Sequence, residues 1–196
     1  MIDRDIKRCL GQMTKGVQVV GASSNGTSRL YCSHWVTQVS FEEPIVMASV
    51  SAKHDTAPLM RSSGVWSVSI LAGDQVAEGQ YFSYPGRKFR YLAPEYVEDW
   101  DGLPVVANSM AYLRCETFAI QSDVGGVQLD HSLYFAHVTA VREGRLREAP
   151  LLYSSRQGWR IQGDKAREPG RSIRDELLAR LEAAGFDDEP EDTEDN

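Results

Sequence analysis

A polar corner at residues 51–56 carries the side chains best suited to binding an anion. The sequence Ser-Ala-Lys-His-Asp-Thr follows an apolar stretch at 44–50 and leads into a predicted helix. Free backbone N–H groups and the helix dipole attract negative charge at such a position. Lys53 adds a positive charge, and Ser51 and Thr56 add hydroxyl donors. The same residues also suit a plain helix N-cap with a surface lysine, and spacing alone leaves both interpretations open.

A strand-like segment before this corner is unusually polar. Residues 30–40, LYCSHWVTQVS, carry a thiol, an imidazole and hydroxyls where a core strand would carry Val and Ile. Polar residues facing water explain most such strands. A flat polar ligand lying along residues 33–38 is the functional alternative, and it is favoured because this strand leads to the anion corner. A molecule with a flat polar head and a phosphate tail would fit both features.

The histidines and cysteines do not form a metal-binding pattern. His131 and His137 share a strand face, but six residues at strand rise place them roughly 20 Å apart. The three cysteines, at positions 9, 32 and 115, include no Cys-x-x-Cys pair. We therefore expect no metal. The adjacent Asp130 and His131 are instead candidates for donating a proton or orienting a ligand.

Hydrophobic periodicity predicts many strands and a few helices. Apolar residues at helical spacing over residues 2–13 predict an opening amphipathic helix that stops before Gly16. Asn25-Gly26 is a strong hairpin signal between two strand-like runs, and Gly125-Gly126 is predicted to join two later strands. Thr56 is predicted to cap a short helix. The remaining predictions are strands at 44–50, 65–71, 111–120 and 127–141, with the first of these covered on both faces, helices at 56–64 and 72–83, and a long irregular excursion at 84–108.

These elements predict an α+β, mainly β fold built on an antiparallel barrel. Regular β-α alternation, which a doubly wound fold requires, is missing. We expect the domain to occupy residues 1–162. An amphipathic helix with an Ile173, Leu177, Leu178 and Leu181 stripe is expected within 163–186, and a disordered acidic tail at 187–196.

Composition excludes several classes of protein. The 196 residues are 42% hydrophobic, which is typical of a globular domain. Of the 28 acidic residues, seven lie in 187–196, so the rest of the chain is neutral and has no basic stripe for nucleic acid. There is no Gly-x-Gly-x-x-Gly or Walker-type motif, no signal peptide and no apolar run long enough for a membrane helix. We expect a cytoplasmic protein.

Seven segments in order resemble the flavin reductase-like family of FMN-binding split barrels. They are GVQVVGAS, SHWVTQVSFEEPIVMASVSAKHDT, SVSIL, DGLPVV, LRCE, DHSLYFAHV and PLLY, and the likeness runs from about residue 5 to 162. No single segment is specific, but their combination and order are.

The resemblance implies a homodimer of antiparallel split barrels, each of which binds FMN near the subunit interface. The isoalloxazine ring is expected against one strand and the phosphate at the corner, with Phe82 and Lys88 in an excursion that covers the flavin. Asp130 and His131 are expected on the nicotinamide or substrate side. The implied cofactor-binding residues are Ser33, His34, Trp35, Val36, Thr37, Ser51, Ala52, Lys53, His54, Thr56, Phe82 and Lys88.

The implied activity is hydride transfer from NADH or NADPH to flavin, in some members as the reductase component that serves a monooxygenase. An FMN-binding electron carrier without nicotinamide activity is the alternative, and a split barrel for a deazaflavin or haem is a third reading. Leu129 and Ala136 stand where the family often has glycine, and Pro44 follows Glu43 where a Pro-Pro step is usual. The added side chains bear on nicotinamide access more than on FMN binding.

Overall fold

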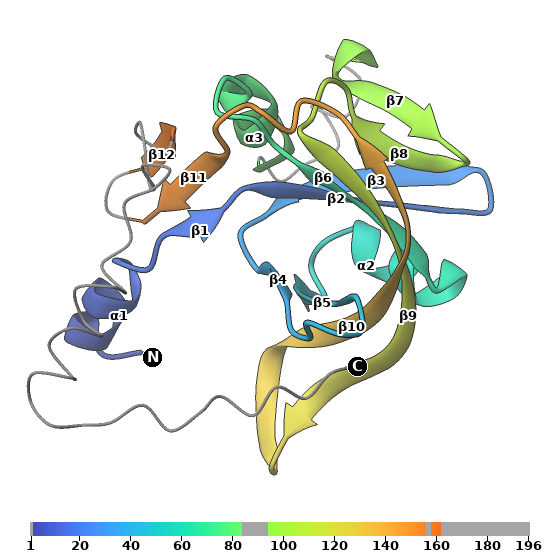
Figure 1. The fold of residues 1–196 in the computed structure, drawn as a ribbon. Coiled ribbons are helices and arrows are strands. Elements are labelled where there is room, and N and C mark those ends of the chain that lie inside the picture. The colour runs from blue at the N-terminus through green and yellow to red at the C-terminus, as the bar shows by residue number, and fades with distance from the viewer. Residues whose placement is uncertain (1, 84–93, 156–157, 162–196) are drawn as a thin grey trace, which may run out of the picture. The chain divides into compact units, whose positions relative to one another are not determined.

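A curled antiparallel sheet of seven strands forms the body of the protein (Figure 1). The computed structural model describes residues 2–83, 94–155 and 158–161. The strand order is β3-β2-β6-β9-β10-β5-β4. The strands are β2 (Gln18–Ser24), β3 (Thr27–Ser33), β4 (Val36–Gln38), β5 (Ile45–Ser51), β6 (Val65–Ile70), β9 (Ala111–Val124) and β10 (Val127–Glu143). This sheet confirms the predicted mainly β, antiparallel barrel architecture.

The turn residues explain the two hairpins predicted within this sheet. Asn25 (φ 49°) and Gly26 (φ 73°) both adopt the left-handed conformation that a tight β2–β3 turn requires. Gly125 and Gly126 do the same between β9 and β10. Burial in β5 alternates along the strand, so the prediction that both of its faces are covered was wrong. One face packs into the core, and the other face is only half buried.

Two smaller sheets complete the β structure. One has the order β1 (Lys15–Gly16), β11 (Leu151–Ser154) and β12 (Gly158–Ile161), and the other pairs β7 (Val97–Trp100) with β8 (Leu103–Val106). The second sheet lies inside the excursion predicted to be irregular at 84–108. This sheet was not predicted from the sequence because proline is rare in central strands, and Pro104 therefore argued against a strand here. In a two-stranded ribbon it is tolerated, and Asp101-Gly102 forms the turn.

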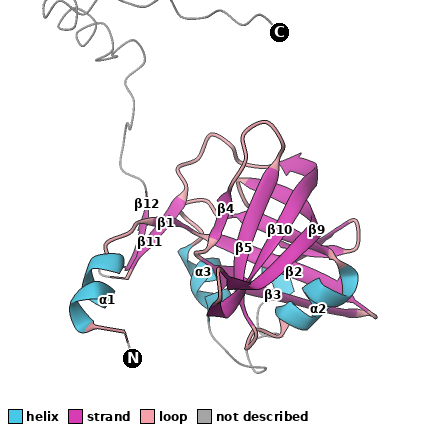
Figure 2. Ribbon diagram, turned by 90° about the horizontal axis from the view of Figure 1, so that it is seen from below, coloured by secondary structure: helices cyan, strands magenta, loops and turns pink. Residues whose placement is uncertain are grey.

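The helices lie at the edges of the β structure (Figure 2). They are α1 (Arg4–Leu10), α2 (Thr56–Ser63), α3 (Val76–Ser83) and the short 3-10 helix η2 (Pro94–Tyr96). Asp55, rather than the predicted Thr56, occupies the N-cap position of α2. Among the residues described, no helix is long and apolar enough to cross a bilayer. The predicted C-terminal helix and acidic tail lie outside the described residues.

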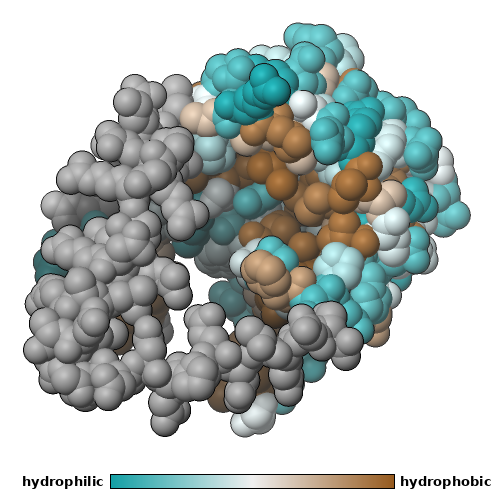
Figure 3. Space-filling model, in the orientation of Figure 1, coloured by the Kyte–Doolittle hydropathy of each residue, from teal (hydrophilic) through white to brown (hydrophobic). Residues whose placement is uncertain are grey.

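The apolar core fills the curve of the sheet. Its largest fully buried side chains are Trp66, Tyr134 and Met60, the last contributed by α2, which packs against β2 and β3. The Trp66 indole N–H donates a hydrogen bond to Thr117 Oγ1 at 3.0 Å, so its polar atom is satisfied. Brown atoms gather inside the curve in Figure 3, whereas polar residues cover much of the rim. Side chains of β5 and β10 belong to this core, which holds both strands in place.

A close backbone contact joins the seven-stranded sheet to β8. The buried Ser67 hydroxyl donates to the Pro104 carbonyl oxygen at 2.6 Å and lies 3.2 Å from that of Gly21. A Cβ on Gly21 would lie 2.7 Å from Ser67 Oγ and would also overlap the Pro104 carbonyl. Only glycine therefore fits at this crossing.

We predict that Gly21→Ala lowers the free energy of unfolding by about 1–3 kcal/mol, because backbone must shift to admit the methyl group. Urea denaturation monitored by tryptophan fluorescence measures the change. Gly16→Ala is the matched control, since a Cβ there meets only the amide end of the flexible Gln18 side chain. Equal stability of the two variants would contradict the crossing constraint.

Candidate functional site

The pairing of β5 with β10 brings the corner and the Asp-His pair together. The antiparallel register runs from Ile45 opposite His137 to Ser51 opposite His131. Residues about 80 positions apart in the chain therefore become direct neighbours. The sequence predicted both features but not their contact.

Backbone hydrogen bonds shape the corner itself. The Ser51 hydroxyl accepts a hydrogen bond from the Lys53 N–H at 3.3 Å, and the Ser51 carbonyl accepts one from the His54 N–H at 3.1 Å. The chain then enters α2 at Thr56, which is only 1% exposed. Lys53 and Asp55 are exposed, and Ser51 and His54 are half buried, so these four residues present the accessible polar groups of the corner.

Aromatic rings extend from the corner across the sheet. The His54 ring stacks on Tyr31, with centroids 4.2 Å apart. His131 meets Trp35 edge-on at 4.8 Å. Trp35 is 46% exposed, and the Lys15 ammonium lies 5.3 Å from its ring centroid. Trp35 and His131 therefore give an accessible aromatic surface beside the polar corner, since His131 lies opposite Ser51, whereas the Tyr31 ring is buried.

Asp130 fixes the orientation of His131. Its carboxylate lies 2.8 Å from His131 Nδ1, and this hydrogen bond lowers the pKa of Asp130 below its ordinary value. An ionised carboxylate only accepts hydrogen bonds, so Nδ1 carries the proton and Nε2 is left for another partner. The regular pairing of β10 with β9 is interrupted between Gln128 and Leu133. Such irregularities re-aim side chains, here those of the Asp-His pair.

Burial and the charge of His131 both lower the pKa of His54. His54 is therefore neutral at pH 7 and offers the corner a hydrogen bond rather than a charge. Lys53 is then the residue of the corner that supplies positive charge. Among the residues described, no three His, Cys, Asp or Glu side chains come together as a metal site.

The polar strand breaks between Ser33 and Val36, which sends its side chains in different directions. Ser33 is 5% exposed, and its hydroxyl accepts the Trp35 N–H at 3.1 Å. The His34 ring stacks on Tyr153 at 4.2 Å and meets Trp159 edge-on at 5.6 Å. Ser33 thus supports the break, and His34 joins a separate cluster at β11 and β12.

A family model described as a flavin reductase like domain matches residues 10–160. The chain belongs to this family. The reductase component of 4-hydroxyphenylacetate 3-monooxygenase from Thermus thermophilus is 29% identical over 154 residues, which cover 79% of this chain and 93% of that protein. A protein named FMN reductase (NADH) from Agrobacterium fabrum is 27% identical over 157 residues, 77% of this chain and 82% of that protein.

A solved structure shares the flavin reductase-like fold. It is a crystal structure of nitrilotriacetate monooxygenase component B from Mycobacterium thermoresistibile. It matches with a TM-score of 0.72 at 22% identity and covers 89% of this chain and 93% of that one. The curled sheet described above is therefore the fold of this family.

The structure places the predicted flavin-site residues in three groups. The first group is continuous around the corner and rings, and consists of Trp35, Ser51, Ala52, Lys53, His54, Asp130 and His131. The second group is buried or lies away from the corner, and it includes Ser33, His34 and Thr56. Val36 packs against the main core, and Phe82 of α3 packs against a second core cluster. Thr37 is exposed on β4, and Lys88 lies outside the described residues.

Lys15, which lies over Trp35, and Tyr31, which stacks with His54, contact predicted site residues but were not themselves predicted. Counting back from the Asn25-Gly26 turn gives the register that the structure shows, with Gln18 opposite Ser33. That count places Lys15 near Trp35, so the sequence did carry this signal. Nothing in the sequence marked Tyr31, because an aromatic residue in a strand is ordinarily core, and the Tyr31 side chain is indeed buried in the core.

We predict that His34 makes stability depend on pH. Burial, aided by the charge of Lys15, lowers the pKa of His34 from 6.5 to about 4. Between pH 6.5 and pH 4, this histidine is protonated in the unfolded chain but neutral in the folded protein. The free energy of unfolding therefore falls as pH falls from 6.5 to 4. In His34→Gln the thermal midpoint should decline less over this range. His137→Gln, at an exposed histidine, is the control and should keep the wild-type slope; an unchanged slope in His34→Gln would refute the prediction.

Proposed function

We propose that the protein transfers a hydride from NADH or NADPH to flavin with FMN bound at the corner, as the reductase component of a two-component monooxygenase. The observation that carries this proposal is the β5–β10 pairing, which joins an anion-binding corner to an exposed aromatic surface and an oriented histidine. The names of the relatives given above support the same activity.

The residues of the corner suit FMN. Lys53 offers a charge, the Ser51 hydroxyl and the neutral His54 ring offer hydrogen bonds, and the start of α2 offers backbone N–H groups. The exposed Trp35 ring contacts His131, which lies opposite Ser51 of the corner, and gives a flat surface for an aromatic ligand. FMN, when bound, supplies the hydride-accepting chemistry. The protein contributes binding and orientation.

His131 and Asp130 are proposed to orient the reacting partner. Asp130 holds the Nδ1 proton of His131, which fixes the ring plane against Trp35. Nε2 can then accept a hydrogen bond, or donate one when the ring is protonated. His131 is 21% exposed at its side chain, so a ligand can reach it. No other side chain of this site is required to move a proton.

A homodimer and an oxygenase partner are part of the same proposal. Several large apolar side chains on the sheet and its loops stay exposed in one chain, including Phe41 at 97% and Phe118 at 52%. Exposed apolar groups of this size are typical of surfaces that another chain covers. Passing reduced flavin to a monooxygenase fits the Thermus relative, which is named as a reductase component.

Anaerobic stopped-flow absorbance near 450 nm tests the function. The FMN-reconstituted protein is mixed with NADH and, separately, with NADPH. We expect rapid bleaching with at least one of them, because the ring surface and His131 admit a second flat ligand. If both leave the flavin yellow while dithionite bleaches it, the protein is an electron carrier and the reductase proposal is wrong.

A further inference from the structure

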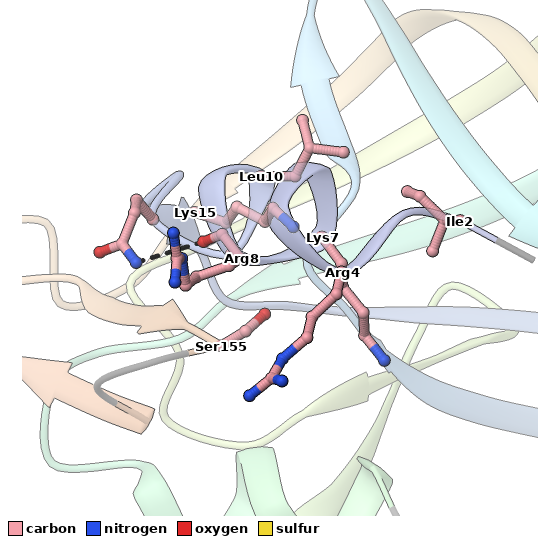
Figure 4. Close-up of a pocket in the computed structure, with 9 residues that line it drawn as sticks. Ile2, Arg4, Lys7, Arg8, Leu10, Lys15 and Ser155 are labelled. Atoms are coloured by element: carbon pink, nitrogen blue, oxygen red, sulfur yellow. Dashed lines mark hydrogen bonds between the residues drawn. The ribbon is translucent and has the colours of Figure 1, made fainter.

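A basic pocket beside α1 lies apart from the corner. It has a volume of about 680 Å³, and its lining comes from α1, the segments on both sides of α1 and a residue just past β11 (Figure 4). Four lining side chains are cationic and none is acidic. The basic pocket is defined by Ile2, Arg4, Lys7, Arg8, Leu10, Gly11, Gln12, Lys15 and Ser155.

Most of this positive charge is uncompensated. Arg8 has Asp5 as an ion-pair partner at 3.4 Å, whereas Arg4, Lys7 and Lys15 have no acidic partner within the described part of the chain. Cations that share one cavity repel each other, and a bound anion relieves that repulsion.

The same pocket exposes apolar surface. Ile2 is 54% and Leu10 50% exposed, and both belong to the apolar repeat at residues 2–13. A cavity that combines several cations with apolar side chains suits a ligand that carries both phosphates and a flat ring. A single small anion would use only half of this lining.

Lys15 connects the basic pocket to the proposed flavin site. It lines the pocket, and its ammonium lies over the Trp35 ring. Trp35 contacts His131, which lies opposite Ser51 of the corner. The aromatic surface of Trp35 and His131 therefore lies between two cationic regions, the basic pocket and the corner with Lys53. If the corner takes the phosphate of FMN, a second cationic region is left for a second phosphate-bearing ligand.

We propose that the basic pocket binds the ADP half of the nicotinamide dinucleotide, an inference that rests on the proposed function. Arg4, Lys7 and Lys15 contact the diphosphate, and Ile2 and Leu10 pack against the adenine. The nicotinamide half then extends past Lys15 toward Trp35 and His131. The pocket thereby anchors the donor through groups that take no part in the hydride transfer.

Steady-state kinetics of the FMN-loaded protein with NADH tests the proposal through the double variant Arg4→Gln/Lys7→Gln. We expect KM for NADH to rise about tenfold with kcat within about twofold, because the lost contacts bind the ground state and transition state alike. The KM difference between wild type and variant should shrink in high salt, which screens such contacts. Arg61→Gln/Arg147→Gln removes the same charge at exposed positions outside the pocket and should leave KM within about twofold.

Calorimetric titration with ADP separates this proposal from the proposed function. Wild type should bind ADP, and the pocket variant should bind it about tenfold more weakly. If ADP binds in this way but neither NADH nor NADPH bleaches the flavin, the result supports the ADP-binding pocket and contradicts the reductase function. If NADH is oxidised while the pocket variant matches its control in both KM and ADP affinity, the cations are only a solvated helix face and the pocket proposal is overturned.

Discussion

The hydrogen-bonded register between β5 and β10 is the constraint on which the proposed site depends. It sets Ser51 opposite His131, and thereby places an exposed lysine, a neutral histidine and an oriented Asp-His pair within one small region. A slip of one residue would turn every side chain of β5 to the opposite face of the sheet. The alternating burial of Val46, Ala48 and Val50 prevents such a slip, because these side chains fill the core. The packing of β5 in the core therefore fixes the register that brings the residues of the proposed site together.

The break between β3 and β4 is the second requirement, and it explains why this segment is polar. The Ser33 hydroxyl accepts the Trp35 N–H and so satisfies a backbone group that has left the ladder. Trp35 is then free to face outward, where it meets His131 and Lys15, while His34 turns to the rings of Tyr153 and Trp159. The polar residues thus divide between shaping the strand and facing a ligand.

Local patterns in the sequence were enough to predict the mainly β fold and most of its elements. Asn25-Gly26 and Gly125-Gly126 specify their turns through backbone conformation, which is a local property. The β7–β8 hairpin was missed because Pro104 argues against a central strand, and the sequence alone does not show that its strand belongs to a two-stranded ribbon. Ser33 and Thr56 were predicted to face a ligand, but both are almost fully buried, and burial depends on packing partners distant in sequence.

The affinity of Lys53→Glu for FMN and for riboflavin, compared by fluorescence titration, tests the central claim most directly. Riboflavin lacks the phosphate, so the substitution should weaken FMN binding about ten- to a hundredfold and riboflavin binding by no more than about threefold. Arg61→Glu, in the exposed last turn of α2, is the matched control and should leave both affinities near wild type. Equal losses for the two ligands in Lys53→Glu would contradict a phosphate site at the corner that the β5–β10 pairing creates.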